Sequence, residues 1–495
     1  MSNTRHSQTG RLADERYMSS EAMVEQRGLS GIAVASRVFL LDNPAQRSLA
    51  WFIQAMSMRE GGLGRFAVDF LAAHPNGFPH PFAGKARDGG VYPQQIDVWE
   101  GSISHILREL CLNPNLNFPR PGEHAYPDTI PHGQLGTDFL FQDAHQIAAI
   151  VPALYKYQRR HAERVRAEFA LTEVGKIVWG TLDACLALRR MVVLDGREGI
   201  GKTEAVKAWA DAHLGEARFV SLSGVSNKSS VFRAISETLG LGASRERKAV
   251  DMQSRIENVL ARSGLMLLLD ESHFLFNQTP RVTTVPELID WVDTALRNHG
   301  VPAALICTPQ FSRHLGRAEQ QVGWNAGQFK RRLLRYQVLP DSISVNDLMK
   351  VARCVVPGLS EAGLKILVGY SADNKQSLSA MTHAVDEARW IAMQDGRDAI
   401  TAQDVRRAVL DYRIPSDKAI ASAMASPAPA GRKSRKPAPV PVADGLQEDF
   451  SRDAEPLLER ESAPDTKANP ETSPRRETAP ATAKFRTGRI DLVNT

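Results

Sequence analysis

The stretch LDGREGIGKTEAVKAW at residues 194–209 contains the pattern G-x-x-x-x-G-K-[ST]. Glycines in such a turn let backbone N–H groups surround an anion. The lysine places positive charge on the β- and γ-phosphates of a nucleotide, and the final hydroxyl ligates Mg²⁺. We therefore expect a nucleoside triphosphate as the ligand, with Mg²⁺ bound partly by Thr203. The residues expected to contact the nucleotide are Gly196, Arg197, Glu198, Gly199, Ile200, Gly201, Lys202, Thr203 and Glu204.

The segments on either side of this motif favour the secondary structure that a phosphate-binding turn requires. MVVLD at 191–195 is a short apolar run typical of a strand, and TEAVKAWADAHL at 203–214 has apolar residues at helical spacing. A helix that begins at the turn directs its positive N-terminal end at the phosphates. The alternative, a chance match in a glycine-rich turn, does not explain this order of strand, turn and helix.

A second acidic element follows about 70 residues later. LMLLLDE at 265–271 is an apolar run, typical of a buried parallel strand, that ends in two acids. At the carboxyl end of such a strand, Asp270 is expected to help hold Mg²⁺, and Glu271 to polarise the attacking water as general base. His273 comes next, either as a residue that couples hydrolysis to a partner or as a packing histidine.

The chain between and beyond these motifs alternates between strand and helix patterns. Strands are expected at 218–224 and 303–308, and the predicted helices are 229–240, 251–264 and 285–300. This alternation predicts an α/β fold of the P-loop NTPase type, with a mostly parallel sheet and helices on both faces.

Several further segments resemble those of AAA+ ATPases. DESHFLF (270–276) is similar to their D-E-A-H-x-L signature, with Ser272 where alanine is usual. CTPQFSRHL (307–315) resembles a G-T-P segment, with cysteine in place of glycine, and DAITAQDVRRAVLDY (398–412) resembles the closing helix of the lid. The resemblance is strongest to the transposition-ATPase branch, typified by phage Mu transposition protein B, TniB and TnsC, with ORC-like and ExeA-like relatives.

This resemblance implies roles for four more residues. Thr308 is expected to sense the γ-phosphate. Arg331 or Arg332, in QFKRRLLRYQVLP (328–340), is expected to be the arginine finger that reaches a neighbouring subunit's nucleotide, where it stabilises developing charge. Either arginine taken singly is equally compatible with a solvated basic face. Lys375 lies near the position of the nucleotide-sensing residue of the lid, where arginine is more usual.

The chain is expected to fall into five parts. Residues 1–30 are a flexible N-terminus, 31–150 are an unrecognised region of mixed helix and long loops, and 155–340 form the nucleotide-binding core. A small helical lid follows at 341–413, and a Pro-, Ala- and charge-rich tail, expected to be disordered, at 414–495. Within the second part, 97–112 is predicted to be one amphipathic helix. Its apolar face comprises Ile103, Ile106, Leu107 and Leu110.

Composition sets broad limits. The chain has 495 residues, a net charge of +5 and a hydrophobic fraction of 43%, which suits several soluble domains and permits a nucleic-acid partner without requiring one. Four cysteines are scattered without metal-ligand spacing, and no metal other than Mg²⁺ is expected. No leader or membrane span is apparent, so the protein is expected to be cytoplasmic, without a membrane partner.

What the nucleotide drives is the remaining question. Basic residues are dense at 154–169 and 329–335. The resemblance implies ATP-dependent homo-oligomers that bind DNA with little sequence specificity and recruit a transposase or recombinase, with the tail as the candidate recruiting segment. One alternative is a nucleotide-gated scaffold or signalling switch, as in antiphage defence, that acts on a protein partner. Segment 154–169 is equally compatible with a solvated helix containing ion pairs. A third hypothesis makes 97–112 part of an N-terminal helical unit that reads DNA.

Overall fold

A computed structural model describes most of the chain. The described residues are 29–79, 83, 94–113, 116, 120–121, 140–224, 227–242, 248–276, 285–373 and 377–411. The expectations for a flexible N-terminus and a disordered tail therefore fall almost wholly outside the described residues. Lys375 also lies outside them.

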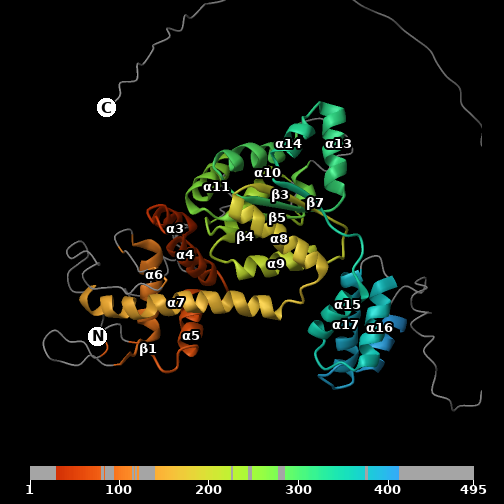
Figure 1. Ribbon diagram of the computed structural model, residues 1–495, viewed down its shortest axis with the longest axis horizontal. Coiled ribbons are helices and arrows are strands. Elements are labelled where there is room, and N and C mark those ends of the chain that lie inside the picture. Colours follow the sequence, from red (N-terminus) through yellow and green to blue (C-terminus); the bar gives the residue numbers. More distant parts are fainter. Residues whose placement is uncertain are drawn as a thin grey trace, which may run out of the picture. The chain divides into compact units, whose positions relative to one another are not determined.

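Five strands form one parallel sheet in the order β4-β5-β6-β3-β7 (Figure 1). Neighbouring strands keep a regular register, in which Asp195 lies opposite Cys307 and Ser221 lies opposite Asp270. The carboxyl ends of these strands therefore share one edge of the sheet. The strands are β3 (Met191–Asp195), β4 (Ala217–Ser221), β5 (Met266–Asp270), β6 (Ala303–Cys307) and β7 (Arg335–Val338).

Alternate residues of the strands enter two hydrophobic clusters, one on each face of the sheet. In β5, Met266 and Leu268 pack with α8 and α9, whereas Leu267 and Leu269 pack with α10 and α11. Strands with two buried faces are expected to alternate in this way. The predicted parallel sheet with helices on both faces is confirmed. The helices are α8 (Glu173–Leu188), α9 (Lys202–Ala212), α10 (Lys228–Thr238) and α11 (Ala249–Ser263).

The predicted helix at 285–300 is less regular than expected. It begins as α12 (Glu287–Trp291) and continues as a π-helical segment, Val292–Leu296. A π-helical turn is rare and is often found near functional sites. Two further helices, α13 (Gln310–Val322) and α14 (Ala326–Arg332), lie between β6 and β7.

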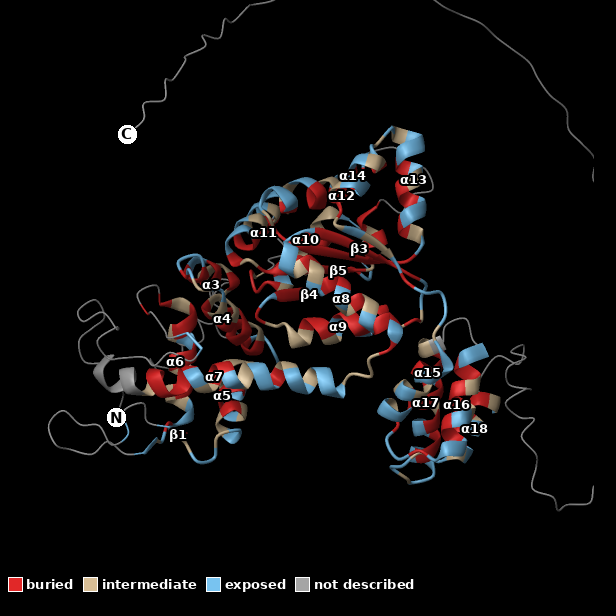
Figure 2. Ribbon diagram, viewed as in Figure 1, coloured by how far each residue is buried: buried red, intermediate tan, exposed pale blue. Residues whose placement is uncertain are grey.

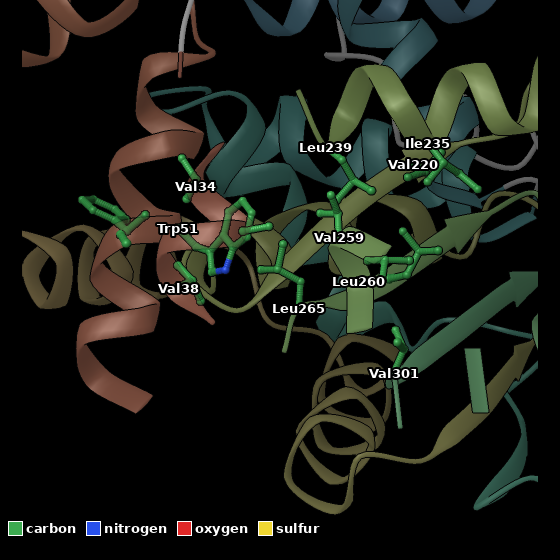
Figure 3. Close-up of a cluster of buried hydrophobic side chains, with 14 of the residues drawn as sticks. Val34, Val38, Trp51, Val220, Ile235, Leu239, Val259, Leu260, Leu265 and Val301 are labelled. Carbon is green, nitrogen blue, oxygen red and sulfur yellow. The ribbon is translucent and has the colours of Figure 1, made fainter. Parts of the chain in front are cut away.

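The N-terminal region shares one hydrophobic core with the sheet. Val34, Val38 and Trp51 pack against residues of α11 and the start of β5 (Figure 3), and the indole Nε1 of Trp51 donates to the carbonyl oxygen of Ser263 at 3.3 Å. The elements of this region are α3 (Gly31–Val38), α4 (Pro44–Ser57), α5 (Gly62–Ala72), β1 (Phe78–Pro79), β2 (Gln95–Ile96), α6 (Glu100–Leu112) and α7 (Leu140–Glu168).

Two of these helices bear on the sequence expectations. Helix α6 is the amphipathic helix predicted at 97–112, and its four predicted apolar residues are all buried. Helix α7 runs without interruption through residues 150–155, the expected junction between the N-terminal region and the core.

Four helices form the lid around a hydrophobic cluster of their own, as predicted. No helix in the described part of the chain is long and apolar enough to span a membrane. The cysteines are all unpaired thiols. The lid helices are α15 (Val345–Val355), α16 (Glu361–Asp373), α17 (Ser377–Gln394) and α18 (Ala402–Asp411).

Candidate nucleotide-binding site

The loop between β3 and α9 has the backbone that the glycine pattern requires. Gly199 and Gly201 adopt left-handed φ angles of 78° and 86°, which strongly favour glycine. Gly196 is needed for space, because a Cβ there would lie 2.9 Å from the side chain of Ile200 and 3.0 Å from Leu339. Space at Gly196 and backbone geometry at Gly201 therefore explain the two glycines of the pattern, and backbone geometry also explains Gly199 between them.

Lys202 lies within the curve of this loop. Its ammonium donates to the carbonyl oxygens of Gly196 and Arg197, both at 2.7 Å, and only 8% of the residue is exposed. Burial lowers the pKa of Lys202, an effect that the nearby carboxylate of Glu271 opposes. A bound phosphate would give this buried ammonium a negatively charged partner in place of neutral carbonyl groups.

The other loop residues divide between the interior and the solvent. Ile200 is buried in the hydrophobic cluster that α8 and α9 form on one face of the sheet. Arg197 and Glu198 are exposed. Glu204 also faces solvent, and its carboxylate pairs with Lys207 at 3.0 Å rather than with the loop.

Thr203 and Asp270 meet at the carboxyl edge of the sheet, although 67 residues separate them. The Thr203 hydroxyl donates to Asp270 Oδ2 at 2.9 Å. Asp270 ends β5 and is 4% exposed, and burial raises its pKa while the Thr203 hydrogen bond opposes that rise. Hydroxyl and carboxylate oxygens are the ligands that Mg²⁺ prefers, so these residues fit the predicted metal ion.

Glu271 lies directly after Asp270, in a constrained backbone. Its φ of 57° is in the left-handed region, unusual for a residue with a side chain. Burial raises the pKa of Glu271, and the neighbouring charge of Asp270 adds to the rise. Glu271 Oε2 is 3.2 Å from Nδ1 of the buried His273, whose own pKa burial lowers. His273 therefore contacts the expected general base. The sequence did not indicate this contact.

Thr308 follows β6 and is 4% exposed. Its buried hydroxyl oxygen has no hydrogen-bond partner among the described residues. A buried polar atom without a partner costs stability, so the site retains a donor for a ligand or a water molecule.

Sequence reasoning missed one contact at the base of the loop. The Tyr336 hydroxyl, on β7, donates to Asp195 Oδ2 at 2.8 Å, and burial raises the pKa of Tyr336. The other carboxylate oxygen of Asp195 is buried without a hydrogen-bond partner in the described structure. The sequence indicated only that Asp195 ends a strand as Asp270 does, because its partner Tyr336 is 141 residues away.

The lid touches the loop directly. The backbone N–H of Leu378, in the first turn of α17, donates to the carbonyl oxygen of Gly199 at 2.9 Å. A Cβ on Gly201 would lie 2.8 Å from the side chain of the same leucine. Movement of the loop around a ligand would therefore displace Leu378 and the start of α17.

The two candidate finger arginines differ in their surroundings. Both lie in the last turn of α14. Arg332 forms an ion pair with the buried carboxylate of Asp293, whereas Arg331 is exposed, with no ion pair among the described residues. The structure therefore distinguishes the surroundings of two arginines that the sequence left as equal candidates.

The chain is similar to solved structures over about half its length. The Aeropyrum pernix ORC2 protein, solved as ADPNP–ADP complexes, is 19% identical with a TM-score of 0.36, over 48% of this chain and 65% of that one. The A. pernix ORC1 protein in complex with DNA is 16% identical with a TM-score of 0.38, over 48% and 65%. The Thermotoga maritima RuvB Holliday junction branch migration motor is 18% identical with a TM-score of 0.31, over 48% and 67%.

The chain thus spans just under two thirds of the length of the two ORC proteins. A comparison with curated proteins finds no significant match. Residues 187–315 match the family described as AAA domain, a span that contains the P-loop, the acidic pair and Thr308. The nucleotide-binding core of this chain is therefore similar to AAA domains, and its fold is that of an AAA-type P-loop NTPase.

Proposed function

We propose that this protein binds ATP with Mg²⁺, hydrolyses it to ADP and phosphate, and uses the cycle to assemble on DNA and recruit a partner such as a transposase or recombinase. The observation that carries the ATPase proposal is the meeting of Lys202, the Thr203–Asp270 pair and Glu271 at one edge of the sheet. These groups derive from two strand ends that are far apart in sequence.

Each group has a task in this chemistry. Lys202 and the loop N–H groups neutralise and orient the phosphates. Glu271 accepts a proton from water as the new O–P bond forms and the bond to the leaving ADP oxygen breaks. Thr203 and Asp270 would hold Mg²⁺, which when bound neutralises charge on the phosphate oxygens. Thr308 is proposed to donate its unpartnered hydroxyl to the γ-phosphate, and Arg331 to act in trans within an ATP-bound oligomer.

DNA is the proposed substrate of the assembled form. The support is the resemblance to transposition ATPases together with the basic segments 154–169 and 329–335, whose charge would add up across an oligomer. The tail at 414–495 is proposed to recruit the partner protein. The competing proposal is a nucleotide-gated scaffold that acts on a protein partner.

The test is sedimentation of the purified protein with duplex DNA at low and moderate salt, without nucleotide, with ADP or with ATP. Phosphate release is measured in parallel, and Glu271→Gln is compared with wild type. We expect ATP-dependent co-sedimentation that Glu271→Gln traps. ATP-dependent assembly without DNA binding would favour the scaffold proposal. Absence of phosphate release at any DNA concentration would refute the proposed ATPase activity.

A further inference from the structure

The second half of α7 presents a row of cations to solvent. Lys156, Arg159 and Arg160 are all exposed, and their spacing of three and four residues places them on one face of the helix. The opposite face is buried, with Leu154 and His161 against the core. Figure 2 shows this part of α7 as largely exposed.

These three cations have no acidic partner in the described structure, unlike their neighbours. Arg164 pairs with Glu168 at 3.9 Å, and Arg166 contacts the ring of His213, whereas no ion pair involves Lys156, Arg159 or Arg160. Exposed cations without partners contribute little to folding stability. Their charge is therefore available to an external anion.

A cavity of about 540 Å³ adjoins this row. Lys156 and Arg160 line one side of it, and the turn from Ala73 to Pro79 lines another. The described lining contains no carboxylate, so the two cations are not neutralised from across the cavity. The turn after α5 thus borders the row of cations.

The other basic segment offers less free charge. In the segment 329–335, Arg332 is held by Asp293, and Arg335 donates to the Thr181 hydroxyl at 3.5 Å. Arg331 is the residue proposed to reach a neighbouring nucleotide, so Lys330 is the one remaining exposed cation of this segment. Between the two basic segments singled out in the sequence, the exposed face of α7 is the better match for a phosphate backbone.

Helix α7 is also connected to the helix that carries the P-loop lysine. Asp211, near the end of α9, pairs with Arg59 of the segment after α4 and lies 3.7 Å from His161 Nε2 of α7. Helix α9 begins at Lys202. A displacement of α7 on binding a ligand can therefore be transmitted through Asp211 and α9 to the phosphate-binding loop.

We infer that the exposed face of α7, centred on Lys156, Arg159 and Arg160, binds the phosphate backbone of DNA, and that Asp211 links this contact to the P-loop helix. The inference rests on the proposed function, since it names the surface through which the protein meets DNA. Such contacts read no sequence and are sensitive to salt.

The experiment measures the affinity of the full-length protein for a fluorescent DNA duplex across a range of salt concentrations. The test variant is Lys156→Glu, Arg159→Glu and Arg160→Glu combined. Its control reverses three exposed cations on other helices, Arg108, Lys365 and Arg406, and so makes the same change in net charge. Unfolding temperatures verify that both variants are folded, and poly-glutamate replaces DNA in a second arm.

We expect the α7 variant to lose on the order of tenfold or more in DNA affinity, and the slope of log affinity against log salt to fall by about 3, close to one for each lost phosphate contact. The control variant should retain the wild-type slope. Equal losses in the two variants would overturn the surface assignment, as would poly-glutamate binding as tight as DNA binding. If the wild-type protein does not bind DNA in any nucleotide state, the proposed DNA function is wrong, whichever surface is tested.

The link through Asp211 has a separate readout. Asp211→Asn should keep the DNA affinity but reduce the stimulation of ATP turnover by DNA. Full stimulation in this variant would refute the link and leave the surface assignment intact.

Discussion

Arg332 forms an ion pair with Asp293, whose side chain is only 5% exposed. Asp293 lies in the π-helical segment after α12, and Arg297 is 3.7 Å from its other carboxylate oxygen. The pair fixes the end of α14 against the core and leaves Arg331, one residue earlier, free of ion pairs among the described residues. Arg332 therefore has a structural task, and Arg331 is the better candidate for contact with a second subunit.

This division predicts different consequences for the two arginines. Arg331→Ala should lower ATP turnover by about 10³-fold or more, the scale of an arginine finger, with an unchanged free energy of unfolding. Arg332→Ala should lower the free energy of unfolding by about 2 kcal/mol, because it leaves the buried Asp293 with only its longer contact to Arg297. Steady-state turnover and denaturant unfolding measure the two effects.

Mixing distinguishes a finger from a residue that acts within its own subunit. Arg331→Ala and Glu271→Gln are each expected to be inactive alone, but mixed oligomers should recover turnover at sites that combine an intact Arg331 with an intact Glu271. No recovery in the mixture, despite assembly, would contradict a role for Arg331 in trans.

Glu271→Gln should separate binding from hydrolysis. The substitution removes the proton acceptor while keeping a similar shape, so turnover should fall by about 10²- to 10⁴-fold, the scale of general base catalysis. Affinity for a fluorescent ATP analogue should stay within about threefold of wild type, since the interaction lost is one made in the transition state. Turnover at the wild-type rate would show that another group activates the water.

The Thr203–Asp270 contact makes a prediction about the metal ion. Asp270→Asn removes a negative charge but keeps an oxygen that can accept from Thr203. We expect nucleotide affinity without Mg²⁺ to be retained and the increase caused by Mg²⁺ to be lost. Asp195→Asn is the matched control, because Asp195 also ends a strand at this edge but bonds to Tyr336. An equal loss in both variants would contradict a metal role specific to Asp270.

The sequence predicted four of the five strands of the central sheet and the P-loop because their signals are local, whereas β7 (Arg335–Val338), with no buried apolar run, was not predicted. Apolar runs such as MVVLD and LMLLLD mark buried strands, and glycines mark positions such as 199 and 201 where the backbone is left-handed. The carboxyl ends of parallel strands then bring Asp270 to the loop without further information.

The missed features depend on contacts between distant segments. Trp51 packs on α11 and bonds to Ser263, 212 residues away, so nothing within 31–150 reveals that this region completes the core. The contact between Tyr336 and Asp195 spans 141 residues. The pairing of Arg332 with Asp293 depends on a π-helical turn that no local pattern indicates.

The stability of the lid should depend on pH through Asp404. The Arg397 guanidinium donates to both oxygens of this carboxylate at 2.7 and 2.8 Å, and Thr401 donates through its N–H and hydroxyl at 2.8 and 2.7 Å. Chiefly because of Arg397, the pKa of Asp404 is held well below its usual range. A carboxyl whose folded pKa is depressed stabilises the fold above its unfolded pKa of about 3.9, and this contribution is lost as pH falls through the folded value.

Asp404→Asn should therefore destabilise α18 at neutral pH by about 1 kcal/mol, the scale of a lost helix cap, and the difference from wild type should shrink as pH falls below about 4. Hydrogen exchange of the α18 amides, corrected for the intrinsic rate at each pH, measures this local stability. Asp398→Asn is the control, because this exposed carboxylate forms no ion pair in the described lid. A difference between Asp404→Asn and wild type that stays constant from pH 7 into the acid range would show that the carboxylate acts through shape rather than through its charge.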